Sequence, residues 1–328
     1  MAEVTKLDVR TDFDIAVIGA GSAGFSAAIT AAEAGATVAL IGHGTIGGTC
    51  VNVGCVPSKT MIRAAEAFHQ PAIMERFAGL AGTATLKSWA DLQAAKQALV
   101  DDLRKAKYED LLSAYPSISY IEGEARFAPQ GLSVDGKLCS ASKTIIATGS
   151  RAVLPDIPGI ADVAVLDSTT ALDLDTLPES LLVIGGGYIG CELAQMFARF
   201  GVKVTLVTRS RLLPEAEPEI SGALKATVIE DGLTVLDDLS YSAITKTDAG
   251  VALTISKNGQ EQIVEASQLL ATTGRKPNIE SLDLAAAGIL VNDRGGIKTY
   301  ASMRTDNPNI YAAGDVTGKD QCVYMAAY

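Results

Sequence analysis

Two cysteines five residues apart, Cys50 and Cys55, are the side chains in this sequence best suited to redox chemistry. Five residues of a regular α-helix rise about 7.5 Å, whereas the Cα atoms of a disulfide usually lie within about 6.8 Å of each other. A bond between these cysteines therefore requires a distorted helical turn. Gly54 loosens the backbone there, and Pro57 lacks the N–H group that would bond the carbonyl of Val53. The segment favours a disulfide that can open and close.

The surroundings of this pair favour reactive rather than structural sulfur. A cysteine at the start of a helix has a stabilised thiolate, and Lys59 adds positive charge near Cys55. Two alternatives stay open, a pair of unlinked core thiols and half of a zinc site. Zinc would need two further ligands, and His43 and His69 are the only histidines in the sequence.

A glycine-rich turn near the N-terminus predicts a dinucleotide-binding unit. The apolar runs Asp14–Ile18 and Thr37–Ile41 predict strands, and an alanine-rich stretch from about Phe25 to Ala34 predicts a helix between them. In such a unit the first glycine of the turn allows a tight bend, the second lets a pyrophosphate approach, and the third lets the helix pack on its strand. The helix N-terminus stabilises the phosphates. The glycines at these positions are Gly19, Gly21 and Gly24.

The same layout returns in the second half of the chain. Leu181–Ile184 and Lys203–Val207 predict strands, and Cys191–Phe200 predicts the helix between them. The glycines of this second turn are Gly185, Gly187 and Gly190. Tight packing without a ligand is the alternative for either turn, but each turn lies between a strand and a helix, as a nucleotide site requires. The sequence therefore predicts an α/β fold with two Rossmann-like dinucleotide-binding domains.

The residues after the second strand of each unit indicate which nucleotide binds. A carboxylate there binds ribose hydroxyls, whereas an arginine accommodates a 2′-phosphate. The second unit has no acid at this point and carries Arg209 and Arg211, which favours NADPH over NADH. Two solvated surface arginines are the alternative. In the first unit the segment Leu40–His43 also lacks a carboxylate, so the ribose of a bound ADP group must find other partners.

Composition and charge exclude several classes of protein. The 328 residues include 27 Lys and Arg against 38 Asp and Glu, for a net charge of −11. Such an acidic surface repels phosphate backbones, so we expect no nucleic-acid partner. No apolar stretch reaches the roughly 18 residues of a membrane span, and the N-terminus lacks the layout of a signal peptide. We therefore expect a cytoplasmic protein without a membrane partner.

The order of these motifs resembles that of the flavoprotein disulfide reductases, or pyridine nucleotide-disulfide oxidoreductases. This family includes dihydrolipoamide dehydrogenase, glutathione reductase and mercuric reductase. The resemblance spans nearly the whole chain. Besides the glycine turns and the cysteine segment, it rests on four further pieces: Ala147–Gly149, Glu192, Thr273–Asn278 and Tyr311–Asp315.

The resemblance implies that the NAD(P) domain is inserted into an FAD domain. The FAD domain would comprise residues 1–150, with a long helical excursion at 60–115, and residues 273–328. The NADPH domain would comprise residues 151–272. Family members continue into an interface domain that forms a homodimer. This sequence stops at Tyr328, so we expect that domain to be absent and the fragment to be monomeric or weakly associated.

The resemblance also implies cofactor-binding roles. FAD would contact seven residues, with Asp315 holding the ribityl chain: Gly24, Gly44, Thr49, Lys59, Ala125, Asp315 and Val323. The family's cofactor motifs further place Gly149, Gly274 and Gly314 in the binding regions. Tyr188 matches an aromatic residue that covers the nicotinamide pocket.

The cysteines and one ion pair would carry the catalytic roles. Cys55 matches the thiolate that faces the flavin, and Cys50 matches the outer thiol. Lys59 and Glu192 match an ion pair beside the flavin. The resemblance therefore implies that electrons pass from NADPH through FAD to this pair of sulfurs.

Within the family the sequence is most similar to the mercuric reductases. The similarity lies in Gly44–Thr49, Ala106–Glu109 and Gln321–Tyr324. It implies reduction of Hg(II) held transiently by Cys50 and Cys55, with Tyr108 near the metal; a helix residue packed in a core is the alternative for this tyrosine. Two other functions stay open, reduction of a small organic disulfide and a non-catalytic fragment that binds flavin or metal.

Overall fold

The computed structural model describes residues 12–327, which pack into two units. The first unit comprises the described residues 12–52, 100–151 and 276–327. The second comprises residues 53–99 and 152–275. The chain passes between the units after Asn52, within a helix near Val100, and in the segments Ser150–Ala152 (β8) and Arg275–Pro277 (β16). Each unit is built around its own parallel sheet.

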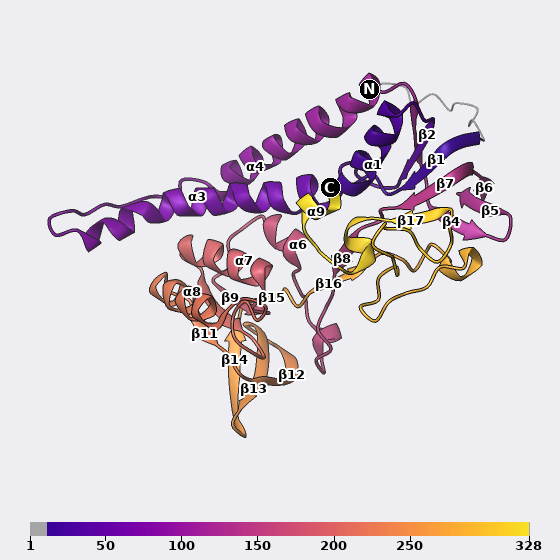
Figure 1. The fold of residues 1–328 in the computed structure, drawn as a ribbon. Helices are drawn as coiled ribbons and strands as arrows, with labels where there is room; N and C mark the ends of the chain where they lie inside the picture. Colours follow the sequence, from indigo (N-terminus) through magenta and orange to yellow (C-terminus); the bar gives the residue numbers. More distant parts are fainter. Residues whose placement is uncertain (1–11, 328) are drawn as a thin grey trace. The chain divides into compact units, whose positions relative to one another are not determined.

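The first unit contains a five-stranded parallel sheet with the order β17-β7-β1-β2-β3. Its central strands are apolar and buried, as expected for a parallel sheet covered on both faces. Helix α1 (Ser22–Glu33) covers one face and packs on β2, as can be followed in Figure 1. The strands are β1 (Asp12–Ile18), β2 (Val38–Gly42), β3 (Ile118–Glu122), β7 (Ser140–Ile146) and β17 (Ile310–Ala312).

The second face of this sheet packs on an antiparallel ribbon and on irregular chain. The ribbon has the order β4-β5-β6, and its inward residues Phe127 and Leu132 share a core with Ile18 and Ile146. A short helix, α9, packs on α1. The remaining elements are β4 (Ala125–Ala128), β5 (Gly131–Val134), β6 (Lys137–Leu138), α2 (Gly48–Asn52), α5 (Asp110–Ala114), the 3₁₀ turns Leu284–Ala287 and Gly314–Thr317, and α9 (Val323–Ala327).

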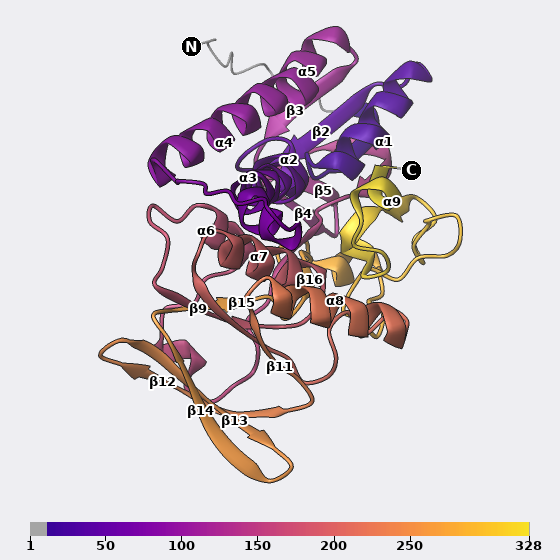
Figure 2. The same cartoon turned by 90° about the vertical axis from the view of Figure 1, so that its left-hand side faces the viewer.

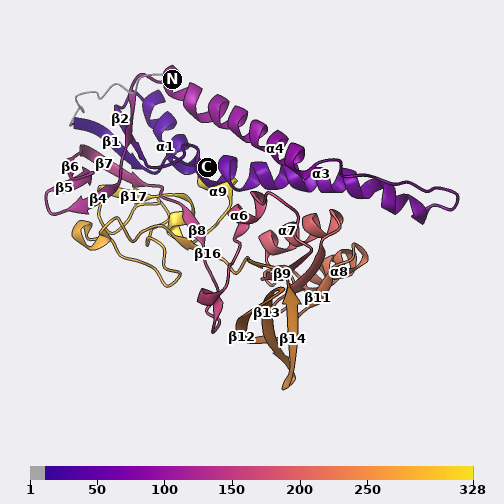
Figure 3. The same ribbon diagram turned by 180° about the vertical axis from the view of Figure 1, so that it is seen from behind.

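The second unit contains a four-stranded parallel sheet with the order β11-β10-β9-β15. One face packs on helices, and the other packs on a three-stranded antiparallel sheet, β12-β13-β14, as Figures 2 and 3 show. The strands are β9 (Ser180–Ile184), β10 (Lys203–Val207), β11 (Thr234–Leu236), β12 (Ser240–Thr247), β13 (Gly250–Lys257), β14 (Gln260–Ala266) and β15 (Gln268–Ala271). The helices are α6 (Ser168–Leu172), α7 (Tyr188–Arg199) and α8 (Pro218–Glu230), with a 3₁₀ turn at Ile160–Asp162.

The predicted helical excursion is present, but its packing differs from our expectation. It consists of α3 (Cys55–Ile73), a 3₁₀ turn (Met74–Arg76), α4 (Trp89–Arg104), a π-helical turn (Lys105–Glu109) and α5. We expected residues 60–115 to belong with the first domain, whereas residues 53–99 pack with the second unit. The physical reason is apolar burial, because Met61 and Ala65 of α3 share a buried cluster with Leu193 and Phe197 of α7.

A buried lysine fixes part of α4 within the second unit. Lys96 is almost fully buried, and its ammonium group donates to the carbonyl of Leu172 at 2.9 Å and to Asp173 Oδ1 at 2.8 Å. The Leu172 carbonyl belongs to the C-terminal turn of α6, where a cation is favourable. This pairing accounts for the burial of a charge that would otherwise be costly.

Both predicted dinucleotide units are confirmed as strand–turn–helix–strand structures in parallel sheets. The helices α1 and α7 begin at Ser22 and Tyr188, three residues earlier than the sequence pattern indicated. The third glycine of each turn, Gly24 or Gly190, therefore lies inside the first helical turn. Among residues 12–327, no helix combines the length and the apolar character that a bilayer span demands.

Candidate cofactor and cysteine site

The first glycine turn is held by contacts that exclude side chains. Gly19 has φ of +115°, and a Cβ there would lie 2.2 Å from the carbonyl oxygen of Ala147. A Cβ on Gly24 would lie 1.7 Å from the carbonyl oxygen of Gly19. Both glycines are therefore required by the packing of the turn itself.

The start of α1 is suited to bind an anion. Its N-cap residue, Gly21, makes no side-chain cap, and the first turn contains no acid. A Cβ on Gly21 would meet only the Cα of Gly48, at 3.5 Å. The N–H groups of the first turn thus have no side-chain acceptor, which leaves them available to a pyrophosphate. These residues fit the ADP half of FAD.

The second glycine turn has the same geometry. Gly185 has φ of +119°, with a Cβ position 2.5 Å from the carbonyl oxygen of Thr272. A Cβ on Gly190 would lie 2.0 Å from the carbonyl oxygen of Gly185. Gly187 differs, because a Cβ there would meet nothing within 4 Å. It caps α7 without a side-chain hydrogen bond, so this turn also leaves room for a phosphate.

The two arginines predicted to bind a 2′-phosphate differ in their surroundings. The guanidinium of Arg211 donates to the carbonyls of Pro214 at 3.0 Å and Ala216 at 2.8 Å, which ties it to its own loop. Arg209 is exposed. Burial raises the pKa of Tyr241 to about 12, and the positive charge of Arg209 acts in the opposite direction. Arg209 is therefore the better candidate for a phosphate contact.

The helix is interrupted between the two cysteines, as predicted. Cys50 is half-buried within α2, which ends at Asn52, and Cys55 is exposed at the first position of α3. Gly54 lies at the break with φ of −123° and ψ of −111°, and its carbonyl accepts the first helical hydrogen bond of α3, from Ser58 N at 3.0 Å. The disulfide itself stays a prediction.

Asn52 fixes the short helix that carries Cys50, a role that the motif analysis missed. Its Nδ2 donates to the carbonyls of Ile46 at 2.8 Å and Gly48 at 2.9 Å. Its Oδ1 accepts from Arg104 Nη1 at 3.2 Å. Both ends of the Asn52 carboxamide are therefore engaged, which holds α2 in one position within the first unit.

Lys59 and Glu192 form the ion pair that the family resemblance implies. Lys59 Nζ lies 2.7 Å from Glu192 Oε1 and 2.6 Å from Oε2, between α3 and α7 of the second unit. The side chains are 56% and 39% exposed, so solvent weakens the attraction. Tyr188 is 67% exposed and precedes Glu192 by one turn on the same face of α7.

Tyr108 packs in the first unit, on the π-helical turn Lys105–Glu109. Its ring meets the ring of Phe25 edge-on, with centroids 4.8 Å apart. Its hydroxyl lies 3.3 Å from Ser22 Oγ, at the first residue of α1. The phenol thus reaches the predicted pyrophosphate region. The Tyr108 ring packs on other side chains, as the packed-core alternative expected, and a contact between Tyr108 and metal stays a prediction.

The C-terminal motifs meet the motif Ala147–Gly149 within the first unit. Ser150 Oγ donates to Asp315 Oδ2 at 2.6 Å, which orients the carboxylate expected to hold the ribityl chain. Asn278 binds both sides of Thr148: its Nδ2 donates to the Thr148 carbonyl at 3.0 Å, and its own carbonyl accepts from Thr148 Oγ1 at 2.6 Å. Ser150 and Asn278 carry no charge, but Ser150 follows the motif Ala147–Gly149 and Asn278 ends the motif Thr273–Asn278, and these motifs are the signal that could have revealed both residues.

Arg151 and Glu280 reinforce the same junction. The Arg151 guanidinium donates to Glu280 at 2.7 Å and 3.0 Å and to Asn278 Oδ1 at 2.9 Å. Hydrogen bonds from Arg151 and then Lys276 hold the pKa of the Glu280 carboxyl well below its usual range. The segment after β16 is therefore fastened to the segment after Gly149 by charged groups.

The remaining predicted cofactor residues differ in how exposed they are. Gly44 and Thr49 are exposed on the segment after β2, and a Cβ on Gly44 would meet nothing within 4 Å. Ala125 is buried at the start of β4, and Val323 is half-buried at the start of α9. Gly314 packs on Ala23 of α1, and Gly274 is exposed next to β16.

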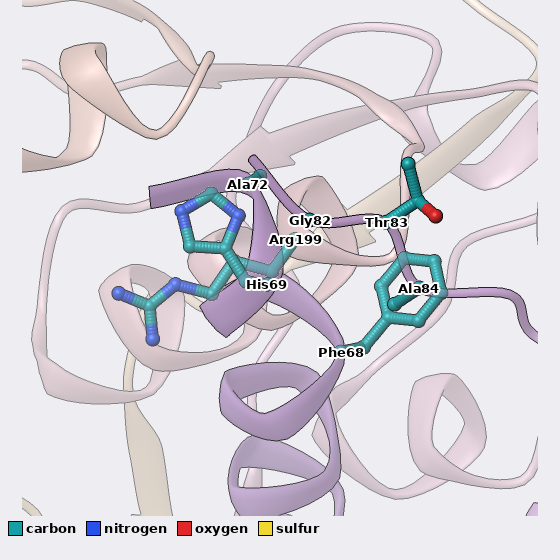
Figure 4. A pocket seen from close by; sticks show the side chains of 7 residues that line it. All are labelled: Phe68, His69, Ala72, Gly82, Thr83, Ala84 and Arg199. Atoms are coloured by element: carbon teal, nitrogen blue, oxygen red, sulfur yellow. The ribbon is translucent and has the colours of Figure 1, made fainter. Parts of the chain in front are cut away.

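A pocket lies in the second unit, and none of the residues that line it is a predicted site residue. Its volume is about 260 Å³. Figure 4 shows the seven residues that line it: Phe68, His69, Ala72, Gly82, Thr83, Ala84 and Arg199. The Arg199 guanidinium forms an ion pair of 2.8 Å with the buried Asp231 carboxylate, and His69 Nε2 lies 3.4 Å from the same carboxylate. Among residues 12–327, His, Cys, Asp and Glu side chains form no group of three suited to a metal, which a zinc site would need.

Two nucleotide-type turns with a cysteine pair at a helix start describe a pyridine nucleotide-dependent redox protein. The chain belongs to the pyridine nucleotide-disulphide oxidoreductase family, which it matches over residues 13–328. Members of this family use FAD and NAD(P)H.

Relatives in the family include mercuric reductases. The mercuric reductase of Staphylococcus aureus is 44% identical over 319 residues, which cover 97% of this chain and 58% of that protein. The mercuric reductase of Streptomyces lividans is 42% identical over 327 residues, covering 98% and 69%. The solved structure of the HOCl-induced flavoprotein disulfide reductase RclA from Escherichia coli matches with a TM-score of 0.82 and 33% identity, covering 96% of this chain and 68% of that chain. This chain thus spans little more than half of the first of these relatives.

Proposed function

We propose that this chain is the catalytic core of an NADPH-dependent FAD flavoprotein that reduces Hg(II) to elemental mercury. The observation that carries the proposal is the 42–44% identity with mercuric reductases over at least 97% of the chain. That span includes Cys50, Cys55 and the Lys59–Glu192 pair. A cytoplasmic location and a homodimeric parent protein belong to the same proposal.

The reaction balances with the reducing equivalents that the nucleotide supplies. NADPH and Hg(II) give NADP⁺, a proton and Hg(0), because a hydride carries two electrons. A bound FAD would supply the redox chemistry that links the hydride of the nucleotide to the cysteine sulfurs. Gly187 and the start of α7 would hold the NADPH pyrophosphate, and Gly21 and the start of α1 would hold that of FAD.

The cysteines would bind the substrate once they are reduced. Hg(II) is a soft ion that prefers thiolate ligands. Cys55 is exposed at the start of α3, where the positive end of the helix dipole stabilises its thiolate. Asn52 would keep Cys50 in place while the disulfide opens and closes, since it fixes α2 at two carbonyls.

Lys59 and Glu192 would order the surroundings of the reacting groups. The ammonium group stays between α3 and α7 because both carboxylate oxygens of Glu192 accept its hydrogen bonds. A cation held at this point is positioned to favour negative charge nearby. Tyr188, exposed on the first turn of α7, would screen the nicotinamide position from water.

The second candidate function is reduction of a small organic disulfide. It is favoured by the likeness to RclA, which is described as a flavoprotein disulfide reductase and has been solved as a Cu(II) complex. The two candidates share the cofactors and the cysteine pair, so they differ in the final electron acceptor. A chain that binds flavin or metal without turnover is the third alternative.

The acceptor is tested by NADPH oxidation in the full-length protein that contains these 328 residues. Thiol-bound Hg(II), Cu(II), lipoamide and glutathione disulfide are compared at matched concentrations, and mercury vapour is measured in parallel. We expect fastest oxidation with Hg(II), with one Hg(0) released for each NADPH consumed. Faster reduction of lipoamide or glutathione disulfide would establish the second candidate instead. Binding of FAD and Hg(II) without NADPH oxidation would establish the third.

The choice of nucleotide is tested at the two arginines. Arg209→Ala should raise the Kd of NADP⁺ about tenfold, the effect of losing one hydrogen bond to a charged group. The Kd of NAD⁺ should change little, because NAD⁺ has no 2′-phosphate. Arg211→Ala serves as the matched control, since its guanidinium braces its own loop and its loss should affect both nucleotides alike. Equal loss of both nucleotides in Arg209→Ala would contradict the NADPH assignment.

A further inference from the structure

The end of β2 lacks both an acid and the room for one. Gly42 is the last residue of β2, where a Rossmann unit usually carries the carboxylate that binds the adenosine ribose. A Cβ on Gly42 would lie 2.8 Å from Ala20 Cβ and 3.0 Å from Tyr120 Oη. The phenol of Tyr120 therefore fills the space that a side chain at position 42 would take.

The neighbouring strand presents two polar side chains at the same edge. In the parallel pairing of β2 and β3, Gly42 lies opposite Glu122 and Leu40 lies opposite Tyr120. Side chains two residues apart on a strand share a face, so Tyr120 and Glu122 project to the same side. That side is the one covered by α1, because Tyr120 and Leu40 pack with Phe25 of α1 in one cluster.

The position of this edge matches that of the ligand in a dinucleotide-binding unit. Ligands of parallel α/β sheets bind beyond the carboxyl ends of the strands. Glu122 is the last residue of β3, and the Gly123 N–H group donates to the Gly42 carbonyl at 3.0 Å, which holds the two strand ends together. A Cβ on Gly42 would contact Ala20, and Ala20 belongs to the glycine turn that is expected to bind the pyrophosphate.

The polar groups at this edge are available to a ligand. Glu122 is exposed, and Tyr120 is half-buried. In the part of the chain that the structure describes, the Tyr120 hydroxyl has no hydrogen-bond partner. Burial, and to a smaller extent the charge of Glu122, raises the pKa of Tyr120. The phenol therefore stays protonated at neutral pH and can donate a hydrogen bond.

We propose that Glu122 and Tyr120 on β3 replace the missing acid of β2 and bind the adenosine ribose hydroxyls of FAD. The Glu122 carboxylate accepts hydrogen bonds from the ribose hydroxyls, and the Tyr120 hydroxyl orients the ribose from the Gly42 side. The inference rests on the proposed binding of FAD. It also predicts that the first unit rejects nucleotides with a 2′-phosphate, because that group would meet the Glu122 charge.

The test is the Kd of FAD for the 328-residue chain, measured by flavin fluorescence. Glu122→Gln should raise this Kd at least tenfold, because a hydrogen bond to a charged acceptor is lost. Tyr120→Phe should raise it about threefold, as for a neutral hydrogen bond. The matched controls are Glu33→Gln and Tyr115→Phe. This second Tyr–Glu pair, joined by a hydrogen bond of 3.0 Å, lies at the opposite end of α1 and should leave the Kd unchanged.

A ligand change provides a measurement that needs no variant. An FAD analogue with 2′-deoxyadenosine should bind the unaltered chain several-fold more weakly than FAD, and Glu122→Gln should reduce that difference. If the unaltered chain binds FAD but Glu122→Gln binds it equally well, or weakens FAD and the analogue to the same extent, the ribose assignment is wrong. If the unaltered chain binds no FAD, the proposed function itself is wrong.

Discussion

Replacing Cys55 by serine should halve the number of electrons that the FAD-loaded chain accepts. A flavin takes up two electrons, and a disulfide takes up a further two. The unaltered chain should therefore require twice as much dithionite as either Cys55→Ser or Cys50→Ser for full reduction, measured by flavin absorbance under anaerobic conditions. In the full-length protein, either substitution should lower NADPH-dependent Hg(II) reduction by a factor of about a thousand, because the sulfur that accepts electrons is gone.

The reason for this large effect lies in the place of the two cysteines. Cys55 stands at the first position of a 19-residue helix, and a two-residue break separates it from the helix of Cys50. The helix start favours the thiolate, and the break removes the regular spacing that would keep the sulfurs apart.

A buried cysteine elsewhere in the chain provides the matched control. Burial raises the pKa of the Cys139 thiol, which keeps it protonated and unreactive. Cys139→Ala should therefore leave the electron count unchanged. An unaltered chain that accepts only the two electrons of its flavin would show that Cys50 and Cys55 form no redox-active disulfide.

The parts of the fold that follow from local physics were predictable from the sequence. The glycine turns could be predicted because their geometry requires glycine at fixed positions. Gly19 and Gly185 adopt backbone angles that other residues disfavour, and Gly24 and Gly190 have no room for a Cβ. The parallel strands were found because buried strands read as continuous apolar runs.

Features that depend on distant contacts were not predictable in this way. The grouping of residues 53–99 with the second unit follows from the burial of Met61 and Ala65 against α7. Helical periodicity shows that a helix has an apolar face, but not which partner covers that face. The helical excursion predicted at 60–115 contains a π-helical turn at Lys105–Glu109, which helical spacing alone does not reveal.

The candidate site shows the same limit at single residues. Sequence comparison of the strand ends revealed that an acid is missing at Gly42, but not that Tyr120 occupies its space. That fact depends on the register of β2 and β3, which joins residues about 80 positions apart. Likewise, Asp315 was predicted from its motif, whereas its hydrogen bond from Ser150 depends on the pairing of β7 with β17, the strands that precede these two residues.

Alanine substitutions in the second glycine turn should separate the role of packing from the role of binding. Gly190→Ala would place a Cβ 2.0 Å from the carbonyl oxygen of Gly185 and 2.6 Å from Thr272 Oγ1. Backbone cannot move aside as easily as a side chain, so we expect a loss of about 3 kcal/mol in the free energy of unfolding. Gly187→Ala meets nothing within 4 Å and needs no unusual φ, since Gly187 has φ of −78°. Its cost as an N-cap residue should stay below about 1 kcal/mol.

For nucleotide binding by the folded molecules we expect the opposite order, with Gly187→Ala weakening the binding of NADPH more than Gly190→Ala. The methyl group of Gly187→Ala would occupy the space beside the uncapped start of α7, which the pyrophosphate is expected to enter. Losing charge-assisted hydrogen bonds there should raise the Kd of NADPH about ten- to a hundredfold. Urea denaturation and equilibrium dialysis with NADPH measure the two effects separately. If Gly187→Ala binds NADPH normally, the turn serves packing alone, and the second unit requires another site for the nucleotide.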